Sequence, residues 1–249
     1  MHTQIHTNPV VEAFLSAEEC PFCCLHRDAE QRAIRFFAGP GASYMEPEIR
    51  GITNRHGFCS NHVKKLYDYG NTLGNALMLQ THMEDLLLEL QTLSAQQGRP
   101  EKKGLFPKKT AEPLSAWQRL TRRAESCAIC EQTEDSLQRH YQVFFSLVKE
   151  AEFRNCVEQS KGFCLAHFGR LLQEAEAHLP GKYADWFYPT VYKVMITNLQ
   201  RVKTDLDLLI AKYDYRNAGL PWGNARDALP RAMQKASGCS PTDPPYRKD

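Results

Sequence analysis

Apolar residues recur every three or four positions along most of this chain, the spacing that places side chains on one face of a helix. No segment shows strict alternation of apolar and polar residues over the length of a strand. The pattern therefore predicts an almost wholly α-helical protein. One apolar helical face follows residue 23 (Leu25, Ala29, Ala33, Phe36 and Phe37), and a similar one follows residue 130 (Leu137, Tyr141, Phe144, Phe145 and Val148).

The same pattern predicts where later helices begin and end. Residues 63–93 read as one long helix, with Gly70 and Gly74 as weak points where it could bend. Pro180 and Gly181 end a helix, and another is predicted over residues 183–213. Beyond it, only residues 225–236 have a helical pattern. We expect Trp222 to dock on the helices and the last ten residues to be disordered.

A cysteine and histidine pattern occurs twice along these predicted helices. The first copy holds Cys20-Pro-Phe-Cys23 and Gly57-Phe-Cys59-Ser-Asn-His62, and the second holds Cys127-Ala-Ile-Cys130 and Gly162-Phe-Cys164-Leu-Ala-His167. Cys20 and Cys59 are 39 positions apart, and Cys127 and Cys164 are 37 apart. The matched order and interval indicate an internal repeat.

The repeat divides the chain into four segments. Residues 1–97 form a first helical repeat with a metal site, and residues 114–216 form a second. Residues 98–113 combine Pro and Gly with four lysines and are predicted to be a flexible basic linker. Residues 217–249 are predicted to be a partly ordered tail. The predicted fold is a duplicated helical bundle with two Cys3His metal knuckles.

Each copy offers three thiols and one imidazole, a donor set that can close a tetrahedron around one ion. A short Cys-x-x-Cys turn brings two sulfurs to one side, and Cys and His three apart share a helix face. Gly57 and Gly162 permit a tight backbone turn before the third cysteine. We expect two zinc ions per chain. An iron–sulfur cluster is the alternative cofactor, since three cysteines and a histidine can also hold one.

The sequence leaves two ways to pair the ligands. Local pairing joins Cys20 and Cys23 to Cys59 and His62 of the same copy. Exchange would instead join Cys20 and Cys23 of the first copy to Cys164 and His167 of the second. We expect local sites, because the short helix pair between the two halves of each motif could form a hairpin that returns the chain.

Composition narrows the classes of function. A chain of 249 residues that is 42% hydrophobic can bury a core, and its formal net charge of +2 gives no general attraction to nucleic acid or lipid. No apolar run reaches the roughly 20 residues of a membrane helix. An odd number of cysteines, nine, and an N-terminus without an apolar signal region predict a cytoplasmic protein.

These observations favour a non-enzymatic, zinc-stabilised helical module that binds a protein or a small ligand. The alternative is an iron–sulfur protein that transfers electrons. A metal-dependent enzyme is disfavoured, because four ligands leave no open coordination position and we find no catalytic motif; no catalytic residue is predicted. The sequence leaves open whether two chains dimerise through the leucine-rich segment 86–93.

Several runs of the chain resemble a bacterial family, common among anaerobic Firmicutes, whose function is unknown. They are the run from His6 to Phe14, Phe36-Phe-Ala-Gly-Pro40, the run from Tyr44 to Arg50, Thr53-Asn54, Asp214-Tyr-Arg216 and Pro221-Trp-Gly223, besides the cysteine motifs. The resemblance covers nearly the whole chain and implies the fold and a cytoplasmic location. Some members are labelled as substrate-binding proteins of transporters, but this chain lacks the signal peptide and the two-lobed α/β pattern of such receptors.

One polar segment of the first copy, residues 45–56, has no counterpart in the second. A specialised function would evolve at such an asymmetry. As a hypothesis, its side chains bind a ligand together with neighbours on the long helix; the alternative is a surface turn with caps and salt bridges. The candidate ligand-binding residues are Glu46, Glu48, Arg50, Asn54 and His56, with Thr81 and His82 on the long helix.

Overall fold

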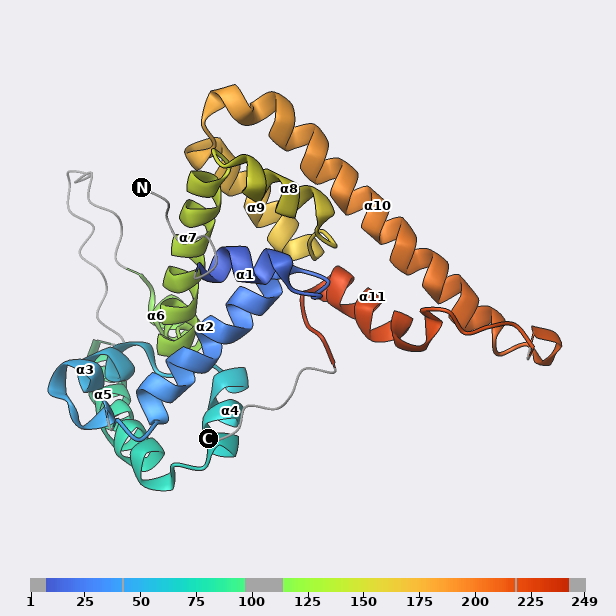
Figure 1. Cartoon of the computed structure of the whole chain (residues 1–249). Helices are drawn as coiled ribbons and strands as arrows, with labels where there is room; N and C mark the ends of the chain where they lie inside the picture. The colour runs from blue at the N-terminus through green and yellow to red at the C-terminus, as the bar shows by residue number, and fades with distance from the viewer. Residues whose placement is uncertain (1–7, 42, 97–113, 218, 242–249) are drawn as a thin grey trace, which may run out of the picture. The chain divides into compact units, whose positions relative to one another are not determined.

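The computed structural model describes residues 8–41, 43–96, 114–217 and 219–241 (Figure 1). Within these ranges the chain forms eleven α-helices and short 3-10 turns, and no strand. The prediction of an all-α fold is confirmed. None of the described helices is both long enough and apolar enough to cross a membrane. The predicted linker, 98–113, and most of the predicted disordered end lie outside the described residues.

Five helices form the first repeat: α1 (Pro9–Leu15), α2 (Pro21–Ala38), α3 (Pro47–His56), α4 (Ser60–Tyr69) and α5 (Thr72–Gln96). Proline opens α1, α2 and α3, where its fixed φ suits the first helical position. Gly70 ends α4 in the left-handed conformation, with φ of 85°. The single long helix predicted over 63–93 is therefore two helices, separated at one of its predicted weak points.

The second repeat has the same order of helices: α6 (Ala116–Glu125), α7 (Ala128–Leu147), α8 (Ala151–Gln159), α9 (Leu165–His178) and α10 (Ala184–Ala211). In each repeat the Cys-x-x-Cys motif falls at the start of the second helix and the third cysteine precedes the fourth helix. The short helices α1 and α6 were not predicted, whereas α3 and α8 lie where a short helix pair was expected between the two halves of each motif. The last helix, α11 (Ala228–Ser237), matches the helical candidate in the tail.

The chain divides into two compact units, and their residue boundaries differ from those of the two sequence repeats. Among the described residues, unit 1 contains those from 8 to 29 and from 134 to 241, and unit 2 contains those from 30 to 133. The boundaries fall inside α2 and inside α7. Each unit therefore combines the beginning of one repeat, up to its Cys-x-x-Cys motif and the first turns of the next helix, with the later helices of the other repeat.

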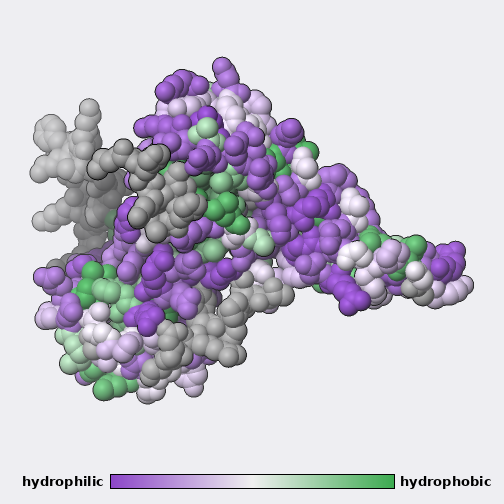
Figure 2. Space-filling model, in the orientation of Figure 1, coloured by the Kyte–Doolittle hydropathy of each residue, from purple (hydrophilic) through white to green (hydrophobic). Residues whose placement is uncertain are grey.

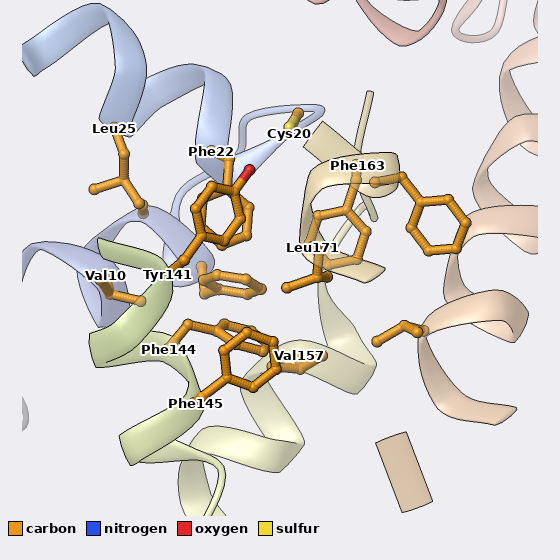
Figure 3. Close-up of a cluster of buried hydrophobic side chains, with 14 of the residues drawn as sticks. Val10, Cys20, Phe22, Leu25, Tyr141, Phe144, Phe145, Val157, Phe163 and Leu171 are labelled. Carbon is orange, nitrogen blue, oxygen red and sulfur yellow. The ribbon is translucent and has the colours of Figure 1, made fainter. Parts of the chain in front are cut away.

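The core of unit 1 is rich in aromatic rings (Figure 3). Phe22 from α2 stacks on Tyr141 from α7, with ring centroids 4.2 Å apart. Phe14 from α1 meets Phe144 and Phe163, at centroid distances of 5.5 and 6.1 Å. Because α1 and the start of α2 come from the first repeat and the other rings from the second, this core forms only when the two repeats are interleaved.

The core of unit 2 is smaller and mostly aliphatic. It joins Ile34 and Phe37 of α2 and Leu66 of α4 to Met78 of α5 and Ile129 of α7. Ile129, which is fully buried, is the second residue between Cys127 and Cys130. The residue inside the Cys-x-x-Cys turn therefore anchors that turn in the core of the other repeat's helices.

Candidate metal centres

Metal site 1, in unit 1, brings together Cys20, Cys23, Cys164 and His167. Cys20 and Cys23 lie at the start of α2, and Cys164 is the N-cap of α9. The Sγ atoms of Cys20, Cys23 and Cys164 lie 3.6, 3.4 and 3.2 Å from Nδ1 of His167. Four donor atoms from two helix starts thus converge on one point.

Metal site 2, in unit 2, brings together Cys59, His62, Cys127 and Cys130. Cys59 is the N-cap of α4, and the other two cysteines lie at the start of α7. Each of the three Sγ atoms lies 3.3 Å from Nδ1 of His62, and the Sγ atoms of Cys59 and Cys130 lie 3.8 Å apart. The two sites have the same donors in the same arrangement.

Both sites use the exchanged pairing, so our expectation of local sites is wrong. Cys20 and Cys23 of the first repeat join Cys164 and His167 of the second, and the remaining ligands form the other group. The physical reason lies in helix length. The 18 residues of α2 rise about 27 Å, whereas the 10 residues of α3 return at most about 15 Å. Helix α3 alone therefore does not bring the chain back to the start of α2.

The spacing of the donors fits one tetrahedral ion in each site. All four donor atoms of a group lie within 4.8 Å of one another. Zinc–sulfur bonds of about 2.3 Å and zinc–nitrogen bonds of about 2.0 Å imply sulfur–nitrogen edges of about 3.5 Å and sulfur–sulfur edges of about 3.8 Å. The sulfur–nitrogen separations of 3.2–3.6 Å in site 1 and the sulfur–sulfur separation of 3.8 Å in site 2 agree with these edges.

The glycine before each third cysteine adopts a positive φ, 59° at Gly57 and 78° at Gly162. A Cβ on Gly57 would lie 2.6 Å from Cε1 of His82, and one on Gly162 would lie 3.4 Å from the carbonyl oxygen of Val194. The sequence interpretation of these glycines as permitting a tight turn agrees with this geometry.

Capping interactions attach the knuckle of site 2 to the helix before Cys127. The last turn of α3 presents its carbonyl groups to α6, where Arg123 donates to the carbonyl oxygens of Asn54 and Arg55, at 2.5 and 2.8 Å. The hydroxyl of Ser126 donates to the carbonyl of His56, at 2.6 Å. These bonds hold the two halves of the exchanged site in register.

Site 1 has a different clamp, supplied by the tail. Lys235 of α11 is only 2% exposed, and its ammonium donates to the carbonyl oxygen of Glu19, at 2.5 Å, and to that of Lys161. Gly238, just after α11, accepts from Sγ of Cys23 at 3.4 Å. The tail residues Lys235 and Gly238 were not predicted to contribute, and a lysine and a glycine in a polar tail carry no signal that would reveal it.

The imidazole of His62 also has a carboxylate partner that sequence reasoning missed. Nε2 of His62 lies 2.7 Å from Oε1 of Glu30, and Lys65 donates to the same oxygen at 2.6 Å. Burial alone would raise the pKa of Glu30, but the bonds from His62 and Lys65 outweigh it and lower the pKa. Glu30 is therefore a charged acceptor that fixes the ring of His62 with Nδ1 toward the thiols.

Hydrogen bonds couple the protonation of the donors within each site. Burial opposes the charged form of His62, but its bonds with Cys127 and Glu30 outweigh that and raise its pKa to about 10. A similar balance, with Cys164 and Cys20 as partners, raises the pKa of His167 to about 10. Burial opposes the thiolate of Cys127 too, yet the bond from His62 lowers its pKa to about 6. An incoming cation would displace these protons.

The two sites differ in exposure. In site 1 all three cysteines are buried. In site 2 Cys127 is buried, but Cys59 is half-buried and Cys130 is exposed. Cys24, Cys156 and Cys239 lie outside both groups. Site 2 is therefore the one that solvent and reagents reach.

The structure brings together only some of the candidate ligand-binding residues. Asn54 accepts from the hydroxyl of Thr81 at 2.7 Å, and its carbonyl accepts from Nδ1 of His82 at 2.9 Å. His56 lies at the end of α3, 3.3 Å from a carboxylate oxygen of Glu131. Arg50 is half-buried in α3, whereas Glu46 and Glu48 are exposed at the beginning of that helix. Ligand binding by this set remains a prediction.

The fold and the two donor sets define an all-α protein with two Cys3His groups that could hold metal ions. The chain belongs to a family of unknown function (DUF6062), whose model matches residues 1–243. The resemblance to a family of unknown function over nearly the whole chain is thus confirmed. No curated protein and no solved structure matches the chain.

Proposed function

We propose that the protein is a non-enzymatic helical binding module whose two repeats are held together by two structural zinc ions. The observation that carries this proposal is that each Cys3His group gathers four donor atoms, contributed by both repeats, within 4.8 Å of one another. Four protein ligands leave no position for a substrate, the arrangement typical of structural zinc. Removing the ions would therefore loosen both units, because metal binding and folding are coupled in such sites.

The spacing of the donors favours a single ion over the alternative, an iron–sulfur cluster. A cluster distributes its protein ligands over different iron atoms, so those ligands lie farther apart than the ligands of one ion. Here every donor pair within a group is closer than 4.8 Å. A redox role based on clusters has no further observation in its favour.

Elemental analysis of anaerobically purified protein tests this proposal. We expect two zinc ions per chain and no absorption in the visible region. Cys164→Ser should lower the zinc content to one, whereas Cys239→Ser, which changes an exposed cysteine outside both groups, should retain two. Iron with acid-labile sulfide and a visible chromophore would overturn the proposal in favour of the redox protein.

We place the protein in the cytoplasm. All nine cysteines carry free thiols, and six of them lie in two close groups. Thiols so close together would be oxidised in a secretory compartment, whereas the cytoplasm keeps them reduced for metal binding. Fractionation of cells that produce the native protein, with blotting of the soluble and exported fractions, tests this location.

A second copy of the chain is the partner that we propose for α5. This helix exposes an apolar row on one face, with Leu79, Met83, Leu87 and Leu90 at helical spacing. Hydrophobic residues lie at the surface in the region of α3 and α5 (Figure 2). Light scattering should give a dimer for the wild type and a monomer for Leu87→Lys, while Leu229→Lys in unit 1 should remain dimeric. A wild-type monomer would exclude this partner.

A further inference from the structure

A basic pocket lies in unit 2, between residues of α3, α5 and α6. It is an open pocket with a volume of about 250 Å³. The charged and titratable side chains that line it are Arg55, His56, Glu89, Arg119, Arg122 and Arg123. Four guanidinium groups thus surround a small volume that contains a single carboxylate. No metal ligand lines the pocket, so its chemistry is separate from that of site 2.

The protein neutralises only part of this charge. Arg119 pairs with Glu89 at 3.1 Å, and Arg123 pairs with Asp85 at 4.0 Å and donates to the carbonyl groups at the end of α3. Among the described residues, Arg55 and Arg122 have no carboxylate within ion-pair distance. The pocket therefore has an excess of positive charge that faces solvent.

Two further observations indicate that a bound anion would stabilise this arrangement. Arg119, Arg122 and Arg123 lie three and four positions apart on α6, a spacing at which like charges repel. In addition, Nε of Arg123 is buried without an acceptor among the described residues. A buried donor without a partner is costly. An oxyanion between these side chains would reduce the repulsion and supply acceptors to the exposed guanidinium groups of Arg55 and Arg122.

We propose that this pocket binds a small molecule that carries phosphate groups. Guanidinium groups match the geometry of phosphate oxygens and form paired, charge-assisted hydrogen bonds with them. The number of arginines suits a ligand with several negative charges better than a monocarboxylate. The volume is below that of a typical drug-sized site and suits a compact polyanion. The inference rests on the proposed binding function and names its class of ligand.

Titration calorimetry with inorganic pyrophosphate, at constant ionic strength, tests the assignment. We expect saturable binding of one pyrophosphate per chain and weaker binding of sulfate. Arg122→Ala should weaken binding about tenfold, and Arg55→Ala together with Arg122→Ala about a hundredfold, because each change removes a charge-assisted hydrogen bond. Arg122 is exposed, so its removal leaves the packing of α6 intact.

Arg32→Ala provides the matched control. Arg32 is an exposed arginine of α2 in the same unit, so this variant loses the same charge outside the pocket. Its binding should change less than twofold. Equal loss in both variants, or no saturable binding by the wild type, would overturn the proposal.

Two more measurements separate the remaining outcomes. The zinc content is determined after each titration. Two zinc ions per chain without pyrophosphate binding would refute the proposed phosphate site and leave the zinc proposal intact. A short single-stranded oligonucleotide is added as a competitor. Oligonucleotide binding that is tighter than that of pyrophosphate and lost in the double variant would reassign the pocket to nucleic acid.

Discussion

Glu30 of α2 contacts His62, one of the candidate ligands of metal site 2. It is only 4% exposed, and its Oε1 accepts from both His62 and Lys65. A carboxylate behind a ligating histidine fixes the orientation of the ring and raises its basicity as a ligand. Lys65 balances the charge, so the buried carboxylate is not left unpaired. Glu30 therefore positions a metal ligand, His62, although it is not itself one of the four ligands.

Replacing this carboxylate should weaken metal binding at site 2 alone. For Glu30→Gln we expect roughly a 10–100-fold loss of zinc affinity at that site, because the neutral amide orients the ring less firmly. Competition with a chromophoric chelator measures both affinities, and that of site 1 should be unchanged. Glu84→Gln, an exposed change in the same unit, is the control. Equal losses at both sites would show that Glu30 acts through overall stability instead.

At the scale of helices, the exchange of halves follows from unequal lengths that recur in both repeats. The 20 residues of α7 rise about 30 Å, and the 9 residues of α8 return only about 13 Å. The short helix alone thus does not bring the third cysteine back to the Cys-x-x-Cys motif of its own repeat. The third cysteine and the histidine of each repeat instead join the Cys-x-x-Cys motif of the other repeat.

The sequence was sufficient to identify the cysteines and histidines that form the two candidate metal groups, but not how they pair. Cysteine and histidine spacing is local information, and the repetition made it specific. The pairing depends on the lengths of α3 and α8, which the brief apolar patterns of these helices did not predict. Glu30 was equally hidden, because its partner His62 is 32 positions away and a lone glutamate on a helix carries no signal.

Pairs of ligand substitutions in the full chain distinguish the two pairings. Cys20→Ser with Cys164→Ser removes two ligands from site 1 and should leave one zinc ion per chain. Cys20→Ser with Cys59→Ser should abolish both sites, since each loses one ligand. Native mass spectrometry counts the ions. Local pairing would give the reverse result, so an ion retained by the second variant and lost by the first contradicts the structure.

The end of α11 protects one site but not the other. A Cβ on Gly238 would lie 3.3 Å from Sγ of Cys164, so the turn after α11 lies directly against site 1. Site 2 leaves Cys130 exposed. We expect a strong chelator to remove one ion in a fast phase and the second in a slow phase. Mass spectrometry after brief alkylation should find label on Cys59 and Cys130 before Cys20 and Cys164; the opposite order would contradict this assignment.

At the scale of the whole molecule, the exchange makes neither repeat complete without the other. Unit 1 needs α1 and the start of α2, and unit 2 needs α6 and the start of α7. The aromatic core shows the same dependence, since Phe14 and Phe22 pack among rings of the second repeat. Both units therefore require both repeats, whatever the residues between them contribute.

Separating the repeats into two polypeptides, 1–97 and 98–249, tests this dependence. Because each site draws ligands from both repeats, we expect the fragments to associate one to one when refolded together with zinc, and to bind two ions per complex. Each fragment alone should lack the cooperative thermal transition of the complex. Introducing Cys20→Ser in the first fragment and Cys164→Ser in the second should give a complex with one ion, since both changes affect site 1. Fragments that fold separately, each with one ion and no affinity for the other, would show that each repeat is a self-contained metal module.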